Sequence, residues 1–208
     1  MSSAQESLQR LIEGNQRFVA GRQEQSTAEM MEKRRELVEG QAPFAIILGC
    51  SDSRVPAELV FDQGLGDLFV IRVAGNVVAP SQIGSIEFAA EAFGTRLVVV
   101  MGHSNCGAIQ ATLDELQRPQ ENRSPNLRSI VDRIRPSIEP LVEAAPQSGD
   151  EDLVERAVRA NIRASARQLR YGSQILEELV QSGELMIVGA EYSLETGEVD
   201  FFEGVDAG

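Results

Sequence analysis

Short apolar runs recur along the chain and give the clearest structural signal. Four of them occupy residues 44–48, 68–73, 97–101 and 185–188. Short, continuously apolar segments rich in Val and Ile are typical of strands buried on both faces, as in a parallel sheet covered by helices. A fifth segment, 197–202, alternates apolar and polar residues. It predicts an antiparallel strand at the edge of the sheet.

The segments between these runs have helical patterns, among them 81–93 and 106–116, and they supply the crossovers that parallel strands need. The chain therefore predicts an α/β fold. We expect a central, mostly parallel sheet of about four strands plus an antiparallel edge strand, flanked by helices. With 208 residues, the chain is long enough for one domain over 1–208.

The first part of the chain (1–40) predicts a helical arm. Ser3 and Glu6 have the spacing of a capping box and open an amphipathic helix. A second capping box begins at Ser26, and Gly40 ends the helix that follows it.

The charge balance argues against polyanionic partners. Nineteen basic and thirty-two acidic residues give a net charge of −13, so we expect binding to neither nucleic acid nor membranes. No apolar run approaches the ~20 residues of a membrane helix, and the first residues lack the pattern of a signal peptide. We therefore expect a cytoplasmic protein, in a compartment where free thiols more often bind metals or act in catalysis than form disulfides.

Arginines repeat along 156–170 so that, on a helix, they fall within about 80° of arc. They are Arg156, Arg159, Arg163, Arg167 and Arg170. Such a face is either solvated or paired with an acidic surface. That acidic surface would belong to this or to a neighbouring subunit. The segment 177–208 holds nine acidic residues and no Lys or Arg, which is typical of a stretch that serves solubility or pairs with a basic surface.

The residues that could bind a metal or take part in catalysis follow two of the apolar runs. Cys50, Asp52 and Arg54 come directly after the first run, and His103 and Cys106 come after the third. In open α/β sheets, sites form outside the carboxyl ends of strands. Both cysteines and the single histidine of the chain lie in these two loops. Thiolates and imidazole are ligands that zinc prefers, so the loops predict a zinc site.

The two loops offer three candidate zinc ligands, one fewer than a structural zinc site needs. A structural zinc site takes four protein ligands, whereas three plus an open position is the pattern of catalytic zinc. Other interpretations remain: a reversible disulfide between Cys50 and Cys106, a cysteine nucleophile with His103 as its base, or a buried histidine beside inert thiols. None of them accounts for Asp52 and Arg54 next to Cys50.

At these motifs the sequence resembles the β-class carbonic anhydrases. Residues 50–54, CSDSR, and 103–107, HSNCG, match the paired signature of that family. The resemblance continues through 11–18 and 67–76 and extends from about residue 5 to 204. It implies reversible hydration of CO₂ to bicarbonate and a proton by a zinc-bound hydroxide.

The resemblance also implies roles for individual residues. One Zn²⁺ per chain would be held by Cys50, His103 and Cys106, and Asp52 with Arg54 would form the catalytic dyad. Two thiolates cancel the formal charge of the metal, so a carboxylate at Asp52 would have to aim the hydroxide at CO₂. Arg54 would keep that carboxylate ionised and away from the open metal position.

Weaker matches extend the implied site to the substrate. Gln41, Phe69 and Phe88 match substrate-side positions of the family, although some members have tyrosine where Phe88 stands. Gly107 would bring a backbone N–H near the substrate, or would simply begin a helix. Ile47 stands where the bicarbonate-regulated subgroup has tryptophan, so the resemblance is to the plant-like, non-allosteric type.

The resemblance implies CO₂ and bicarbonate as ligands and a homodimer or higher even oligomer, with a tetramer favoured, because the family uses N-terminal helices to embrace a partner subunit. Two other functions stay open at this point: a CS₂ or COS hydrolase on the same scaffold, and a non-enzymatic thiol or zinc redox sensor.

The single histidine leads to a kinetic prediction. If His103 binds the metal, the chain has no spare imidazole to carry protons out of the site. We expect turnover in stopped-flow CO₂ hydration to rise with the concentration of external buffer. Saturation of the rate at very low buffer concentration would contradict this.

Overall fold

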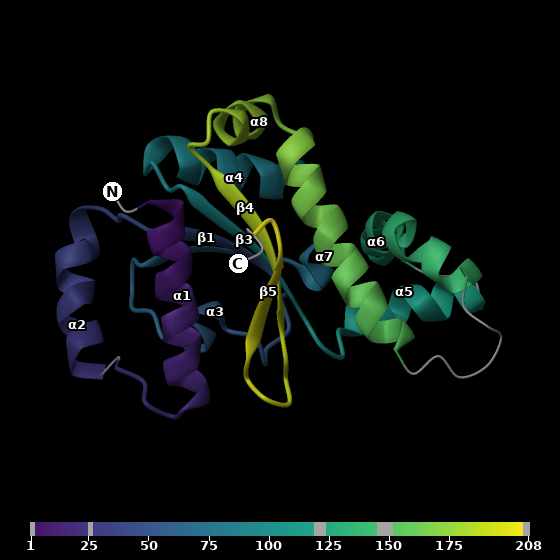
Figure 1. The fold of residues 1–208 in the computed structure, drawn as a ribbon, viewed down its shortest axis with the longest axis horizontal. Helices are drawn as coiled ribbons and strands as arrows, with labels where there is room; N and C mark the ends of the chain where they lie inside the picture. Colours follow the sequence, from purple (N-terminus) through teal and green to yellow (C-terminus); the bar gives the residue numbers. More distant parts are fainter. Residues whose placement is uncertain (1–2, 25–26, 119–123, 145–151, 206–208) are drawn as a thin grey trace.

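The computed structural model describes residues 3–24, 27–118, 124–144 and 152–205, and its centre is a five-stranded sheet (Figure 1). The strands are β1 (Ala45–Gly49), β2 (Leu68–Arg72), β3 (Leu97–His103), β4 (Met186–Tyr192) and β5 (Val199–Glu203). Their order across the sheet is β2-β1-β3-β4-β5. The first four are parallel and β5 is antiparallel to β4, so the predicted fold class is confirmed.

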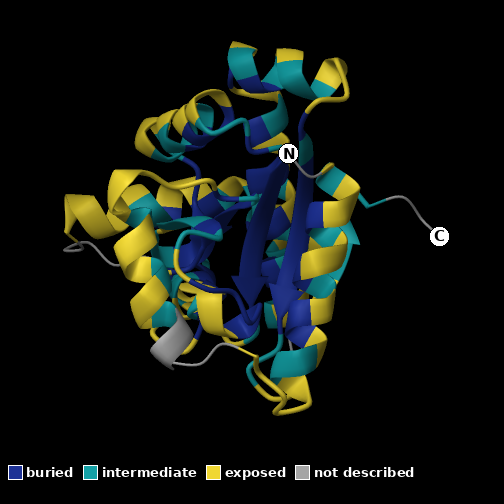
Figure 2. Ribbon diagram, turned by 90° about the vertical axis from the view of Figure 1, so that its left-hand side faces the viewer, coloured by how far each residue is buried: buried dark blue, intermediate teal, exposed yellow. Residues whose placement is uncertain are grey.

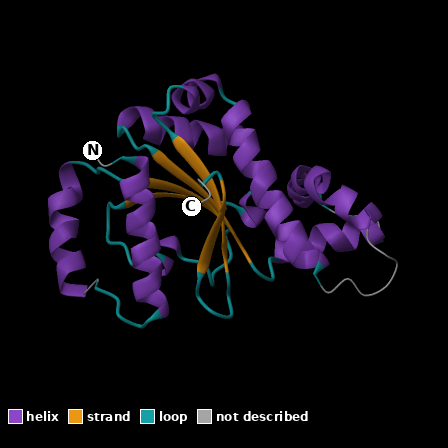
Figure 3. Ribbon diagram, viewed as in Figure 1, coloured by secondary structure: helices purple, strands orange, loops and turns teal. Residues whose placement is uncertain are grey.

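Helices cover both faces of this sheet (Figure 3). They are α1 (Ala4–Val19), α2 (Thr27–Glu36), α3 (Ala57–Val60), α4 (Pro80–Ala92), α5 (Gly107–Gln117), α6 (Pro125–Ala144), α7 (Leu153–Tyr171) and α8 (Gln174–Gln181). Among the described residues, no helix combines the length and the apolar content that crossing a membrane requires.

The strands separate two hydrophobic layers because successive side chains point to opposite faces. On β1, Ile46 and Leu48 pack with α4 to α8, whereas Ala45 and Ile47 pack with α1 and α3. All residues of β1 and β3 are buried, and the strands are the dark centre of Figure 2. Burial on both faces explains why these strands read as continuous apolar runs rather than as alternating ones.

The N-terminal helix is part of the sheet's own cover. Leu11 of α1 is fully buried on the face of the sheet that α1 and α3 cover. Asn15 is buried too; its amide nitrogen donates to Val60 O and Gly197 O, and its oxygen accepts from Val199 N. The helix α1, which lies in the segment predicted as an arm, thus packs against the core of its own chain. The helix after the second capping box begins at Thr27, and Ser26 itself lies outside the described residues.

Two elements are longer than the sequence pattern predicts. The helix α6 contains Pro136 and Pro140. Proline is unfavourable inside a helix because it lacks the backbone N–H, so the sequence does not predict a continuous helix here. The strand β4 continues past the apolar run to Tyr192 and pairs there with Gly102 and His103 of β3. The carboxylate of Glu191, within this part of the strand, accepts a hydrogen bond from Arg159. A charged residue inside a buried strand ends the apolar run early, so the run predicts only the first part of β4.

The arginine face of α7 lies against the acidic C-terminal hairpin. Arg159 bonds Glu191 at 2.8 Å and Asp200 at 2.5 Å. Glu203 forms ion pairs with Arg170 at 3.0 Å and with Arg163 at 3.7 Å. Of the two interpretations of this face, pairing with an acidic surface therefore holds for these three arginines.

The buried Asn15 leads to a stability prediction. We expect Asn15→Ala to lower the free energy of unfolding by about 3 kcal/mol, because it leaves two carbonyls and one N–H without partners. The measurement is urea unfolding followed by circular dichroism. Gln16→Ala, at the exposed neighbouring position on α1, should change the stability by less than about 0.5 kcal/mol. Equal effects of the two substitutions would contradict the role of Asn15.

Candidate metal centre

The parallel register of β1 and β3 brings the two chemical loops together. Gly49 lies opposite Met101, so Cys50 and His103 leave the sheet at the same edge. Cys106 follows three residues later at the start of α5. The ligand atoms of Cys50, His103 and Cys106 all lie within 4.8 Å of one another, and all three residues are buried. The structure thus brings together the three residues that the sequence proposes as ligands.

The histidine has one nitrogen satisfied and one nitrogen free for a ligand. His103 Nδ1 lies 2.9 Å from Ser104 O, a geometry in which Nδ1–H donates to the carbonyl. His103 Nε2 is buried and has no hydrogen-bond partner in the described part of the chain. A buried nitrogen without a partner is costly unless something binds it. Together with two thiols at this spacing, it fits a soft divalent metal such as zinc.

Backbone contacts fix the loop of Cys50. Arg72, the last residue of β2, donates from Nε to Cys50 O at 3.0 Å and from Nη2 to Asp52 O. Gly75 N–H donates to Cys50 Sγ at 3.3 Å. Neither Arg72 nor Gly75 belongs to the site predicted from the sequence. Arg72 has a detectable signal, since it is a charged residue at the carboxyl end of a buried strand.

The two thiols are not equivalent in the metal-free chain. The hydrogen bond with Cys106 is the largest influence on Cys50, and it lowers the pKa of the Cys50 thiol well below its usual range despite burial. The same contact raises the pKa of Cys106. Burial opposes protonation of His103, but the neighbouring Cys50 thiol group and the hydrogen bond to the Ser104 carbonyl raise the pKa of the imidazole.

Asp52 and Arg54 form a two-pronged ion pair beside the ligands. Arg54 Nε lies 2.9 Å from Asp52 Oδ1 and Nη2 lies 2.7 Å from Oδ2, while the backbone N–H of Arg54 also donates to Oδ1. These contacts hold the pKa of the Asp52 carboxyl far below its ordinary value. Asp52 Oδ2 is also 3.8 Å from His103 Nε2. An ionised carboxylate therefore faces the side of the ligand set where the free nitrogen points.

The substrate-side positions do not join this cluster within one chain. Phe69 lies opposite Ile46, four residues before Cys50, which separates it from the ligands by about 13 Å along the strands. Phe88 packs against Phe69 at 6.3 Å between ring centroids and is 56% exposed. Gln41 precedes β1 and is exposed at the opposite edge of the sheet from Cys50.

Gly107 lies next to the ligands as the first residue of α5. A Cβ atom added there would meet nothing within 4 Å, so steric crowding does not require glycine at this position. Gly107 borders a mainly apolar hollow of about 290 Å³ between the start of α5 and α6, whose wall includes Ala74 and Val131.

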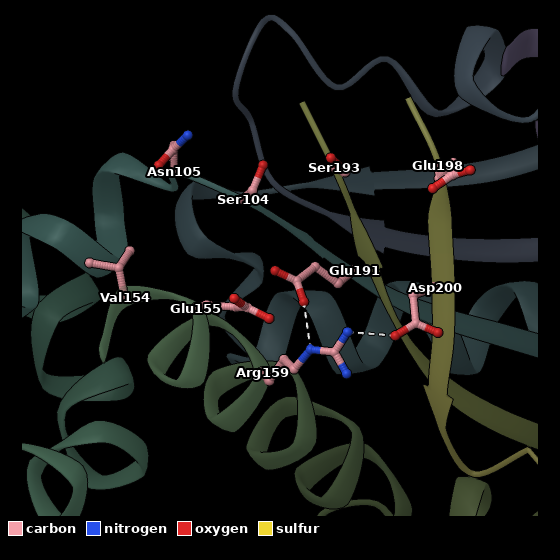
Figure 4. Close-up of a pocket in the computed structure, with 9 residues that line it drawn as sticks. All are labelled: Ser104, Asn105, Val154, Glu155, Arg159, Glu191, Ser193, Glu198 and Asp200. Atoms are coloured by element: carbon pink, nitrogen blue, oxygen red, sulfur yellow. Dashed lines mark hydrogen bonds and ion pairs between the residues drawn. The ribbon is translucent and has the colours of Figure 1, made fainter. Parts of the chain in front are cut away.

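A second hollow, of about 440 Å³, lies beside the loop that joins the two ligands of β3 and α5. Ser104 and Asn105 form one wall, and Arg159 crosses the floor between Glu191 and Asp200 (Figure 4). Ser104 N–H donates to Tyr192 O and Ser104 Oγ accepts from Leu194 N. The end of β4 thereby supports the residue that orients His103.

Known proteins with a similar sequence belong to one family. A family model described as "Carbonic anhydrase" matches residues 45–199. A carbonic anhydrase of Mycolicibacterium smegmatis is 40% identical over 190 residues, which cover 91% of this chain and 89% of that protein. Carbonic anhydrase 2 of Mycobacterium tuberculosis is 38% identical over 189 residues, covering 90% and 87%.

A solved structure has the same fold. The β-carbonic anhydrase CcaA superimposes with a TM-score of 0.76 at 30% sequence identity, covering 97% of this chain and 93% of that one.

The unequal thiols lead to a prediction for the metal-free protein. We expect one thiol per chain to be ionised at pH 7 and the other to stay protonated, because Cys106 donates its hydrogen bond to Cys50. Thiolate absorbance at 240 nm, titrated against pH, measures this. Cys50→Ser should remove the step at low pH. Two thiols that both titrate near the ordinary value of ~8.5 would contradict it.

Proposed function

This chain belongs to the β-class carbonic anhydrases, and on that premise we propose that it hydrates CO₂ reversibly to bicarbonate and a proton with one zinc ion per chain. Cys50, His103 and Cys106 would hold the zinc. The observation that carries the proposal is the set of three buried ligand atoms within 4.8 Å of one another, with the Asp52 carboxylate beside the free nitrogen of His103.

Bound zinc would lower the pKa of a coordinated water to about 7 and so supply a nucleophile at neutral pH. The side chains around the metal would orient the nucleophile and hold its proton. Asp52 Oδ2 would accept a hydrogen bond at the open side of the ligand set and hold the proton there. A carboxylate in this position orients the oxygen that attacks CO₂.

Arg54 would act through Asp52. Its two-pronged bond leaves the carboxylate ionised and would restrain it from moving into the open metal position. Because the folded pKa of Asp52 is depressed, the ion pair is intact above the ordinary carboxyl pKa and is lost only as the pH falls through the lower folded value. Asp52 therefore keeps its charge throughout the range in which the enzyme would work.

The remaining substrate-side residues would serve a second copy of the chain. Gln41, Phe69 and Phe88 are too far from the ligands of their own chain to touch its substrate. The exposed ring of Phe88 belongs to an aromatic cluster with Phe69 and Phe93, with centroids 5.5–6.3 Å apart. Exposed aromatic surface of this kind is typical of interfaces.

We infer a homodimer, or a higher even oligomer such as a tetramer, in which each site is completed by its neighbour. Two β-carbonic anhydrases of Sordaria macrospora with a similar fold (TM-score 0.71, 23% identity) are described as tetrameric. An isologous dimer would bring this face of each chain to the ligands of the other.

The role of Asp52 has a direct test. We expect Asp52→Asn to lower kcat/KM for CO₂ hydration by ~100-fold or more while one zinc per chain is retained, because the amide cannot accept the hydrogen bond as a carboxylate does. Stopped-flow CO₂ hydration and metal analysis measure the two quantities. Asp132→Asn, at an exposed position on α6, is the matched control and should be as active as wild type. Equal rates for Asp52→Asn and wild type would refute the role, and turnover of CS₂ or COS without CO₂ hydration would refute the proposed reaction.

A shared site can be tested by mixing subunits. We expect Gln41→Ala and Asp52→Asn each to lower the activity when expressed alone. When the two chains are co-expressed, each mixed dimer has one site with both defects and one site with none. Random pairing makes about half of the dimers mixed, so about a quarter of the wild-type activity should return. A mixture that shows only the average of the two variants would place Gln41 outside the neighbouring site.

A further inference from the structure

A short backbone turn contacts the thiol of Cys50. The 3-10 turn Ala74–Asn76 follows β2 and carries Gly75, whose N–H donates to Cys50 Sγ at 3.3 Å. Gly75 has φ +66° and Asn76 has φ +43°, so two successive residues adopt the left-handed conformation. A Cβ atom at Gly75 would lie 2.9 Å from Ile134 and 3.0 Å from Ala108. The left-handed conformation and the lack of room for a Cβ atom both favour glycine at this position.

Glycine alone does not fix the direction of its N–H, because its backbone has the widest conformational freedom. The helix α7 supplies the constraint. Asn161 Nδ2 donates to Gly75 O at 2.8 Å, and Ser165 Oγ donates to Asn76 O at 3.1 Å. Asn161 is 3% exposed and Ser165 is 4% exposed. Two buried side chains one helical turn apart therefore hold the two carbonyls that follow the N–H.

We infer that Asn161 is a positioning residue of the metal centre: by holding Gly75 O it aims the Gly75 N–H at Cys50 Sγ. Ser165 supports the same turn one residue further on. The inference rests on the proposed function, since it concerns a thiolate that would bind zinc.

The expected consequence is electronic. A hydrogen bond to a metal-bound sulfur withdraws charge from it, and contacts of this kind tune the metal. Two thiolates already neutralise the formal charge of a divalent ion, so a donor that draws charge from one of them preserves the Lewis acidity that the reaction needs. The large sequence separation between Asn161 and Gly75 explains why no local motif indicates this role.

The test uses the full-length protein with cobalt(II) in place of zinc, and separately with zinc. In Asn161→Leu, which keeps the size of the side chain and removes the donor, we expect the thiolate-to-cobalt charge-transfer band to move to longer wavelength. Competition with a chromophoric chelator should show a ~10- to 100-fold weaker hold on zinc. Ser165→Ala should shift the band in the same direction by less, and it carries the test if Asn161→Leu does not fold.

Leu169→Val is the matched control. Leu169 is buried on the same helix, about 12 Å further along it, and loses packing without touching the turn. Its band should stay at the wild-type wavelength even if its thermal midpoint falls. An unchanged band in folded Asn161→Leu, or the same shift in Leu169→Val, would overturn the inference alone. A wild-type protein that binds no metal would overturn the proposed function, and this inference with it.

Discussion

The parallel pairing of β1 with β3 is the constraint on which the site depends. Neither loop contains a complete ligand set, and 53 residues separate Cys50 from His103 in the sequence. The register of Gly49 opposite Met101 brings both loops to one edge of the sheet. A shift of one residue would turn every side chain of β1 to the other face and separate the ligands. The hydrophobic layers on both faces of the sheet therefore specify the metal centre as well as the fold.

The sequence predicts those parts of the molecule that depend on local pattern. Four apolar runs and one alternating segment predict the five strands. The clustering of both cysteines with the single histidine predicts the ligands, because thiols and imidazoles are rare in this chain. The supports around the ligands are different. Arg72, Asn161 and Ser104 act through backbone carbonyls or a hydroxyl, and their partners are set by tertiary packing. Arg72 is marked in the sequence only by its charge at the end of an apolar run, and nothing near Asn161 or Ser104 in the sequence distinguishes them from ordinary polar residues.

Sheet geometry also separates three predicted substrate-side residues, Gln41, Phe69 and Phe88, from the ligands of their own chain. Motif matching assigns Gln41 and Phe88 to the substrate, yet the strand geometry puts both far from the ligands of their own chain. The conflict disappears if the functional unit contains two chains. A sequence match transfers a role without saying which subunit performs it, and only the sheet geometry exposes the difference.

Neither nitrogen of His103 faces solvent. One nitrogen is bonded to Ser104 and the other faces the thiols, so the imidazole is not available as a surface group. No other side chain type in this sequence has an ordinary pKa between about 5 and 8. The strongly negative charge of the molecule is therefore nearly constant across neutral pH. A catalyst that releases a proton in every forward turnover would thus keep the same electrostatic field while the acidity around it changes.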